Sequence, residues 1–479
     1  MSTETTTVTS EPRARVIAAA LSRVRWVEVV GLGAPIALLA VLALRDLDAI
    51  SFWRDEVASV VFAKASIGEL VTVVGRDREK VGLVNMATYY LILHFWLVIG
   101  ETEARIRLFS VLAGILALVP VYFVARRIAG WLAGALAAAC FALLPFVTQY
   151  SQEARGYSLA MLVAGGLTWL VLIGIERRSL WPWLAYGIVA TLGLYVHFFV
   201  ALVIGAHGLW LLATRQVPGW RASLVALAPL VVGVIPIPLA IGEYGGGHRW
   251  IGGVTLDQVT RTFVGLLGSG WVALAALGLA TMAVLAQRSD RRLWLLVGAA
   301  ILPIAVTVIL SMVKPLLVPR YLVVSLPAIA VLMGCGLVAL RSHWRIVAVV
   351  ALAVAMLVNL PRAYADIRQQ DWRGAARWIL RDAVSGDQLV MRGWGRRPME
   401  YYLDRYATGG PRPHLTSAGD AAMNSDIDRV WLVVTGEYNG ALPPLLPALD
   451  GAYDVVEHRP FAAKVTVVLL ERVAVPAGG

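Results

Sequence analysis

A series of apolar runs, each long enough to form a helix across a lipid bilayer, dominates this sequence of 479 residues. A transmembrane helix needs about 20 predominantly apolar residues, with some variation in length. Runs of this kind occur at 29–44, 106–124, 129–147, 157–175, 183–196, 198–213, 222–241, 271–286, 293–312, 321–340 and 344–360. Because backbone groups in lipid must be hydrogen-bonded internally, the sequence predicts an α-helical polytopic membrane protein with about eleven transmembrane helices.

Composition argues against a soluble protein and against a nucleic-acid-binding protein. The chain is 59% hydrophobic and 15% charged, whereas soluble domains are roughly half apolar and a quarter charged. Its net charge of +11 is spread in small groups between the apolar runs, which indicates membrane topology and contact with anionic lipid rather than nucleic acid binding. Cys140 and Cys335 both lie in apolar runs, so neither a disulfide framework nor a zinc finger is predicted.

The positions of the arginines predict the orientation of the helices. Short loops on the cytoplasmic side carry an excess of Lys and Arg. With the N-terminal tail 1–28 inside, the cytoplasmic loops contain Arg126, Arg127, Arg177, Arg178, Arg215, Arg221, Arg288, Arg291, Arg292, Arg341 and Arg345. All short basic loops then face the cytoplasm.

The apolar stretch 83–99 has two interpretations. It contains Asn85, Tyr89, Tyr90 and His94, and if it crossed the membrane all later basic loops would face outward, against the positive-inside rule. We therefore predict a juxtamembrane or re-entrant helix within a long first external loop, 45–105. A membrane-spanning helix is the alternative.

The composition becomes more polar after residue 360. Residues 371–379 have the pattern of an amphipathic helix, and 388–391, 430–435 and 464–470 have that of strands. The sequence thus predicts a transmembrane domain at 29–360 and a small α/β domain at 361–479, which the helix count places outside the cytoplasm.

Three polar clusters interrupt the apolar sequence at helix ends, and the predicted topology puts all three on the external side. The first contains Asp55 and Glu56; the others contain Gln152, Glu153, Arg155 and Tyr157, and Lys314, Arg320 and Tyr321. A carboxylate in apolar surroundings can act as a general base. Arginine binds phosphate through two hydrogen bonds, and helix starts favour anions. Together the clusters indicate a site for an anionic, lipid-borne substrate.

Each cluster also has a simpler interpretation. An Asp-Glu pair can be a solvated turn, Glu153 and Arg155 a surface ion pair at a helix cap, and Arg320 a side chain that reaches toward lipid headgroups. The glycine-rich stretch 242–250, which includes Arg249, can be either a gate for the acceptor or a flexible connector. The occurrence of three charged clusters on one face favours a functional site.

These motifs, in this order, resemble a known family of membrane enzymes. They are Trp53-Arg-Asp-Glu56, Tyr89-Tyr-Leu-Ile-Leu-His-Phe-Trp96, Gly100-Glu-Thr-Glu-Ala-Arg-Ile-Arg107, Tyr150-Ser-Gln-Glu-Ala-Arg-Gly-Tyr157, Tyr195-Val-His197, Pro319-Arg-Tyr321 and Asp371-Trp-Arg-Gly-Ala-Ala-Arg377. The chain resembles GT-C glycosyltransferases of the group that includes dolichyl-phosphate-mannose protein mannosyltransferases and lipid A aminoarabinose transferases. The resemblance covers most of the membrane region.

The resemblance implies inverting transfer of a sugar from a polyprenyl-phosphate donor to an acceptor outside the cytoplasmic membrane. It assigns the base to Asp55, with Glu56 orienting it or contacting the acceptor. It assigns donor-phosphate binding to Arg155 and Arg320, and we add Tyr321 and Lys314 from the same cluster. Substrate contacts are expected from Asp77, Tyr89, His94, Gln152, Glu153, Tyr157, His197 and Arg249. Many members have His-Pro-Pro before the paired tyrosines, whereas this chain has Val84-Asn-Met-Ala-Thr-Tyr-Tyr90, so Asp77 is a candidate replacement.

Several parts of this hypothesis stay open. No metal ligands are assigned, and a divalent cation is not placed; membrane lipid is an expected partner and nucleic acid is not. Mannose is the expected sugar and a pentose such as arabinose the alternative, while the acceptor is a glycolipid, polysaccharide or protein of the cell envelope. A transporter or flippase for a lipid-linked sugar, and a non-catalytic binder, are the alternative functions. A transporter predicts charges deep within the spans, whereas the clusters here lie at span ends.

Overall fold

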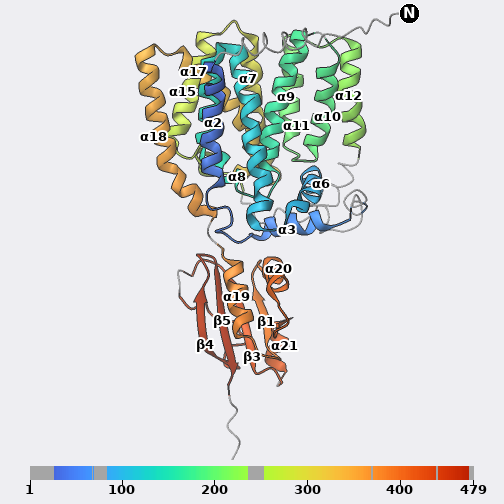
Figure 1. Cartoon of the computed structure of the whole chain (residues 1–479), viewed down its shortest axis with the longest axis vertical. Coiled ribbons are helices and arrows are strands. Elements are labelled where there is room, and N and C mark those ends of the chain that lie inside the picture. The colour runs from blue at the N-terminus through green and yellow to red at the C-terminus, as the bar shows by residue number, and fades with distance from the viewer. Residues whose placement is uncertain are drawn as a thin grey trace, which may run out of the picture.

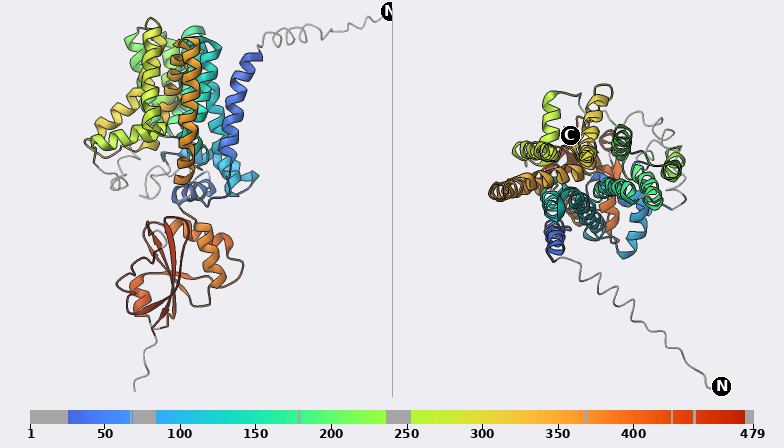
Figure 2. Two further views of the ribbon diagram at one scale, coloured as in Figure 1. Left: turned by 90° about the vertical axis from the view of Figure 1, so that its left-hand side faces the viewer. Right: turned by 90° about the horizontal axis from the view of Figure 1, so that it is seen from above.

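The chain forms a bundle of membrane-length helices followed by a domain built on a β-sheet (Figure 1). The computed structural model describes residues 26–66, 68, 84–177, 179–235, 253–367, 370–424, 426–438 and 441–473. A view turned by 90° shows the same two parts, with α2 at the rim of the bundle (Figure 2). The predicted fold class, a helical multi-span membrane protein with a C-terminal domain containing strands, is confirmed at this level.

The bundle consists of helices from two-thirds of the chain. Its elements are α2 (Trp26–Leu44), α3 (Arg54–Lys64), α6 (Ala87–Trp96), η1 (Leu97–Ile99), α7 (Glu103–Leu143), α8 (Pro145–Ser151), α9 (Tyr157–Arg177), α10 (Trp181–Leu194), α11 (Val200–Ala213), α12 (Trp220–Val234), α14 (Leu256–Leu267), α15 (Gly270–Ala286), α16 (Arg291–Ser311), η2 (Pro319–Ser325), α17 (Leu326–Ala339) and α18 (Ser342–Ile367).

The long helix α7 is two helices joined by a tight reversal. Ala129 and Gly130 have non-helical dihedral angles, and Gly130 has φ of 84°, which glycine adopts without steric cost. A Cβ at Gly134 would lie 2.9 Å from the carbonyl oxygen of Tyr122. In a straight helix these residues would be far apart along the axis, so the two halves fold back on each other. The two predicted runs 106–124 and 129–147 thus form separate helical arms, with Arg126 and Arg127 close to the turn.

Every predicted apolar run coincides with a helix or a helical arm, although run 222–241 is described only to residue 235. Six helices in the described part of the chain are long and apolar enough to span a membrane, or seven if the pair α14 and α15, bent by 80°, is one span. The helices α10, α11 and α12 are shorter, with 14, 14 and 15 residues. The predicted number of eleven crossings therefore stays a prediction.

Small residues let the central helix approach its neighbours. Among the described residues, the most enclosed candidate span is Pro319–Ala339, formed by η2 and α17, with 89% of its apolar window buried. Gly334 packs against the backbone of α7 at Ala133 and Ala137, and Gly336 against the backbone of α15 at Leu279, with no room for a Cβ at either position. Close backbone approach through small residues is a common way for helices to associate in membranes.

The first loop forms two short helices at the end of the bundle nearest the sheet. The helix α3 lies across this end, and α6 stands beside it (Figure 1). The stretch 87–99 has only 13 residues in helix, which is about 20 Å at 1.5 Å per residue and short of a bilayer core. This placement agrees with the juxtamembrane prediction for 83–99.

The C-terminal domain is a five-stranded mixed sheet with helices packed on it. Its elements are α19 (Trp372–Asp382), β1 (Gln388–Arg392), α20 (Arg396–Tyr406), β2 (His414–Thr416), α21 (Ala418–Met423), β3 (Arg429–Thr435), β4 (Tyr453–Pro460) and β5 (Val465–Arg472). The strand order is β2-β1-β3-β5-β4, with β1 parallel to β2 and β3, and β5 antiparallel to β3 and β4. The predicted helix and three predicted strands are α19, β1, β3 and β5.

Candidate active site

Asp55 and Glu56 occupy the first turn of α3. The Glu56 side chain accepts a hydrogen bond from the Trp53 backbone nitrogen, with Oε2 3.3 Å away, as in a capping box. Negative charge in the first turn also suits the helix dipole. Successive residues of a helix point about 100° apart, so the two neighbouring carboxylates face different surroundings.

The Glu56 carboxylate is fully engaged by the protein. Arg107 of α7 donates from Nε to Oε1 at 2.8 Å and from Nη2 to Oε2 at 2.7 Å. The backbone nitrogen of Ala154 donates to Oε1 at 2.8 Å. Glu56 is 1% exposed and Arg107 2% exposed. This buried, bidentate ion pair joins α3, α7 and the loop before α9.

Arg107 also holds the segment that leads into α3. Its Nη1 donates to the carbonyl oxygens of Leu47 and Ile50, at 2.7 and 2.8 Å, and its Nη2 donates to that of Ser51 at 3.2 Å. A buried arginine is tolerated only when its donors are satisfied. Since the donors of Arg107 reach both the carboxylate and the preceding loop, this residue fixes where α3 begins.

Asp55 has a different environment. Its residue is half-buried, and within the described residues its carboxylate accepts no hydrogen bond. Arg155 lies beside it, with Nη1 3.4 Å from the Asp55 carbonyl oxygen and 3.0 Å from the Tyr90 hydroxyl. The Arg155 guanidinium also lies 6.0 Å from the centroid of the Tyr157 ring. The Asp55 carboxylate, which accepts no hydrogen bond from the described residues, thus lies close to the cation Arg155.

A second cation, Arg320, lies near the same group of residues. It is the second residue of η2, after Pro319, and its guanidinium carbon lies 5.7 Å from the Trp53 ring centroid and 5.9 Å from that of Tyr321. It is close enough to Asp55 and Glu153 for electrostatic attraction. Arg155 and Arg320 therefore both attract the carboxyl groups of Asp55 and Glu153.

Glu153 lies inside this cluster as a buried acid. It is 7% exposed, and in the part of the chain that the structure describes its Oε1 has no hydrogen-bond partner. Burial, together with the negative charge of Glu56, raises the pKa of Glu153 to about 8 despite the attraction of Arg320 and Arg155. At pH 7 this side chain is therefore mostly neutral.

His197, in the turn between α10 and α11, packs against two aromatic rings of this cluster. Its ring lies 5.7 Å from that of Tyr157 and 5.4 Å from that of Tyr321, measured between centroids. Burial and the neighbouring Arg155 and Arg320 lower the pKa of His197 to about 3, so the imidazole is neutral. The Phe199 backbone nitrogen donates to Nδ1 at 3.3 Å, which leaves the proton on Nε2 in this arrangement.

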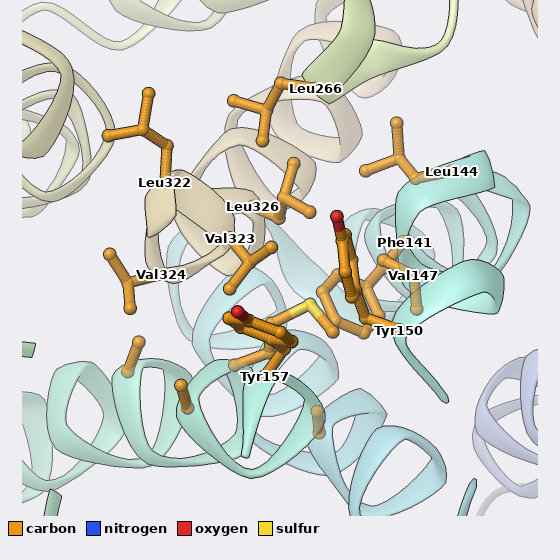
Figure 3. Close-up of a cluster of buried hydrophobic side chains, with 14 of the residues drawn as sticks. Phe141, Leu144, Val147, Tyr150, Tyr157, Leu266, Leu322, Val323, Val324 and Leu326 are labelled. Carbon is orange, nitrogen blue, oxygen red and sulfur yellow. The ribbon is translucent and has the colours of Figure 1, made fainter. Parts of the chain in front are cut away.

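Apolar packing supports the cluster from beneath. Tyr150 and Tyr157 stand side by side, with ring centroids 4.8 Å apart, against Val323 and Leu326 (Figure 3). Leu266 of α14 lies in the same cluster (Figure 3). The polar groups of the site thus lie against closely packed apolar side chains, which limit the access of water from within the bundle.

Comparisons with known proteins show which family model and which solved folds the chain resembles. Residues 85–241 match the family model described as dolichyl-phosphate-mannose-protein mannosyltransferase. No curated protein sequence matches the chain significantly. The matched segment contains Tyr90, Arg107, Glu153 and Arg155, so the family assignment covers a large part of the charged cluster.

Solved structures of low sequence identity share the fold over nearly the whole chain. ArnT from Cupriavidus metallidurans in the apo state is 16% identical, covering 91% of this chain and 97% of that chain, with a TM-score of 0.62. ArnT bound to undecaprenyl phosphate is 15% identical, covering 94% and 99%, with a TM-score of 0.60. The chain shares the fold of ArnT, and its residues 85–241 match the mannosyltransferase family model. The archaeal oligosaccharyltransferase AglB from Archaeoglobus fulgidus, in complex with an inhibitory peptide and a dolichol-phosphate, is 11% identical, covering 85% and 69%, with a TM-score of 0.51.

Some of the side chains predicted for the candidate site have other contacts in the structure. Gln152 donates from Nε2 to the carbonyl oxygens of Leu42, Ala43 and Arg45 at 3.3, 3.2 and 2.7 Å, and so caps the end of α2. If Gln152 binds substrate as predicted, its side-chain amide has to do so while it also holds these carbonyl oxygens.

Three further predicted residues lie toward the margins of the candidate site. The hydroxyls of Tyr89 and Ser110 are 3.0 Å apart, and Tyr89 is fully buried. His94 Nδ1 lies 2.7 Å from the Ala63 carbonyl oxygen, at the far end of α3 from Asp55. Lys314 is exposed just after α16. Two other predicted residues, Asp77 and Arg249, lie outside the described residues.

Sequence reasoning missed two residues of the candidate site. Tyr90 contacts Arg155, whereas only its neighbour Tyr89 was predicted to bind substrate. Arg107 received no role, although it is a lone charge at the start of a long apolar run; ionisable residues in such runs are usually paired or functional. Among the described residues, no group of three or more His, Cys, Asp and Glu side chains is placed to hold a metal ion.

Proposed function

We propose that the chain is an inverting glycosyltransferase that moves a sugar from a polyprenyl-phosphate donor to an extracytoplasmic acceptor, with Asp55 as the general base. The observation that carries this proposal is the contrast between two neighbouring carboxylates. Glu56 accepts hydrogen bonds from Arg107, Trp53 and Ala154, whereas the Asp55 carboxylate accepts none from the described residues and is attracted by Arg155 and Arg320. Glu56 is assigned the role of orienting α3, and Asp55 that of accepting a proton.

The proposed reaction is one displacement at the anomeric carbon. The acceptor hydroxyl oxygen forms a bond to that carbon while the bond from the carbon to the donor phosphate oxygen breaks. The hydroxyl proton passes to Asp55, and the electron pair of the broken bond remains on the polyprenyl phosphate. One carboxylate is sufficient because an inverting displacement forms no covalent sugar–enzyme intermediate. Arg155 and Arg320 offset the charge that grows on the phosphate.

The distribution of arginines supports an extracytoplasmic site. Arg292 donates from Nη1 to the Arg127 carbonyl oxygen at 2.9 Å, and Arg127 pairs with Glu176 at 3.1 Å. These contacts gather three predicted cytoplasmic loops at one end of the bundle, whereas α3 and the C-terminal domain lie at the other end (Figure 1). By the positive-inside rule, we assign eleven crossings in the cytoplasmic membrane, with the site and the C-terminal domain outside.

Mannose is the proposed sugar, because the family model is described by mannosyl transfer from dolichyl phosphate. A pentose is the alternative, and the acceptor is a hydroxyl of a glycolipid, polysaccharide or protein. Binding of undecaprenyl phosphate to ArnT, which has the same fold, supports a polyprenyl-phosphate donor.

The test is sugar transfer by the purified protein in lipid. Radiolabelled polyprenyl-phosphate mannose, and separately a polyprenyl-phosphate pentose, are incubated with the protein and a crude membrane fraction as acceptor. We expect label in the acceptor fraction from one of the two donors. If neither donor is used while both bind, a lipid-sugar transporter or binding protein becomes the better interpretation.

Replacement of Arg320 by alanine is expected to weaken binding of undecaprenyl phosphate about 10- to 100-fold, because a hydrogen bond between charged groups contributes roughly 1.5–3 kcal/mol. The affinity is measured in detergent by thermophoresis or calorimetry. Arg341→Ala is the matched control, since Arg341 is an exposed arginine of a predicted cytoplasmic loop and its loss should change the affinity less than about twofold. Equal losses in the two variants would contradict the assignment of Arg320 to the donor phosphate.

Donor binding is expected to weaken as the pH rises from 7 to 9. The pKa of Glu153 is about 8, so the side chain is neutral below this pH and gains a negative charge above it, next to the arginines that bind phosphate. The phosphate monoester of undecaprenyl phosphate has its second ionisation near pH 6, below this range. Wild type should lose affinity for undecaprenyl phosphate about tenfold, whereas Glu153→Gln should stay nearly constant. Parallel pH profiles for the two proteins would exclude Glu153 as the cause.

A further inference from the structure

The C-terminal domain is bonded directly to the segment that carries the proposed base. Segment 47–53 leads into α3, and its contacts with the C-terminal domain come from α19, α20 and the residues just before α19. These contacts join parts of the chain more than 300 residues apart in sequence. The domain is therefore part of the support of the site rather than an independent module at the end of the chain.

Tyr402 of α20 makes the closest of these contacts. Its hydroxyl accepts a hydrogen bond from the Phe52 backbone nitrogen at 2.6 Å and donates one to Glu103 Oε1 at 3.0 Å. Tyr402 and Phe52 are both 0% exposed, and Glu103 is 5% exposed. Burial and the Glu103 charge raise the pKa of Tyr402, so the hydroxyl stays protonated and able to donate. One hydroxyl thus links the C-terminal domain, the catalytic segment and the start of α7.

A second set of bonds lies beside the first. The Trp372 backbone nitrogen donates to Ser51 Oγ at 2.9 Å, and Ser51 Oγ donates to the Gln370 carbonyl oxygen at 3.1 Å. Arg373 donates from Nη2 to the carbonyl oxygens of Asp48 and Ala49, at 2.9 and 3.1 Å. The C-terminal domain thus bonds to four consecutive or nearly consecutive positions of the segment.

The segment is consequently held from two sides by different groups. Arg107, from the bundle, binds the carbonyl oxygens of Leu47, Ile50 and Ser51. The C-terminal domain binds the carbonyl oxygens at 48 and 49, the Ser51 hydroxyl and the Phe52 nitrogen. Asp55 follows Phe52 by three residues, so a shift of this segment moves the base. Displacements of about 1 Å can cost on the order of 100-fold in rate.

We propose that Tyr402 is a positioning residue, through which the C-terminal domain fixes the segment 47–53 and thereby the place of Asp55. This inference rests on the proposed function of Asp55, but the docking of the segment is a separate physical claim. A catalytic role for Tyr402 itself is not implied, because its hydroxyl is already engaged by Phe52 and Glu103.

The experiment compares Tyr402→Phe with Tyr401→Phe in the full-length protein. The first variant removes the acceptor for the Phe52 nitrogen and keeps the ring. The second removes a neighbouring hydroxyl whose bond, 2.8 Å from Arg405 Nη1, stays within α20. Sugar transfer, undecaprenyl phosphate affinity and amide hydrogen exchange of segment 47–56 are measured for both variants and for wild type.

For Tyr402→Phe we expect kcat to fall about tenfold, donor affinity to stay within about twofold, and amide exchange in segment 47–56 to accelerate about tenfold. Tyr401→Phe should match wild type in all three. Unchanged exchange in Tyr402→Phe would overturn the docking claim, and faster exchange with unchanged kcat would overturn the positioning role. If wild type transfers no sugar, the proposed function has failed, and the exchange data still decide whether Tyr402 holds the segment.

Discussion

Replacement of Asp55 by asparagine is expected to reduce sugar transfer about 10²- to 10⁴-fold, the range in which general bases usually contribute. Asparagine keeps the size of the side chain and its place on α3 but cannot take the proton of the acceptor hydroxyl. Binding of undecaprenyl phosphate should be retained or strengthened, because one negative charge beside Arg155 and Arg320 is lost. Transfer rates and donor affinity are measured on the same purified sample.

The control for this prediction is Asp48→Asn. Asp48 is an exposed acid in the same segment, so its replacement changes the net charge equally without touching the site. It should transfer sugar at close to the wild-type rate. Wild-type activity in Asp55→Asn would remove Asp55 from the mechanism, and a joint loss of activity and donor affinity would assign it to binding instead.

Replacement of Arg107 by alanine is expected to cost about 3–5 kcal/mol of folding free energy, as is usual when one partner of a buried ion pair is removed. The change leaves the Glu56 carboxylate buried with two of its hydrogen bonds lost, and it frees the carbonyl oxygens of Leu47 and Ile50. The purified protein should unfold at a clearly lower temperature in detergent, measured by intrinsic tryptophan fluorescence, or fail to accumulate.

Arg105→Ala provides the comparison within the same helix. Arg105 is exposed two residues earlier on α7, and its loss should change stability by less than about 0.5 kcal/mol. The double variant Glu56→Leu with Arg107→Met should be more stable than Arg107→Ala, because no unpaired charge remains buried. An unfolding temperature of Arg107→Ala equal to that of wild type would show that the pair does not stabilise the fold.

Apolar length was sufficient to predict the longer apolar helices of the bundle, but not the shorter and more polar helices α3 and α14. The energy of transfer into lipid depends on composition alone, so a run such as 157–175 identifies α9 without knowledge of its neighbours. The reversal at Gly130 was predicted for the same reason, since Arg126 and Arg127 interrupt the apolar sequence there. The motif around Glu153 and Arg155 likewise predicted residues that the structure brings close to Asp55.

Long-range partners could not be read from the sequence. Whether Glu56 or Asp55 is open depends on Arg107, which belongs to another helix, and no local pattern specifies that pairing. Gln152 could equally have faced a substrate, and its contacts at the end of α2 depend on how α2 packs against α8. Tertiary packing therefore decides which carboxylate is paired and what the Gln152 side chain contacts.

The elements missed in the C-terminal domain were those with weak local patterns. The strand β2 has three residues, too few for an alternation to be recognised. The strand β4 is an edge strand with a mostly exposed face, so its sequence is too polar to stand out. The helix α20 begins with two arginines and a proline, and its apolar side is recognisable only from what it covers.

The separation of Phe52 and Tyr402 by 350 residues affects when a newly made chain becomes active. Ribosomes add about 5–20 residues per second, so roughly 20–70 s pass between synthesis of the two residues. During this time Asp55 and the first helices are already inserting into the membrane. A nascent chain lacks the hydrogen bonds that join Tyr402 to Phe52 and Glu103 until translation has nearly ended. On the proposed role of Tyr402, chains from interrupted translation should therefore transfer sugar at least about tenfold more slowly than the full-length protein.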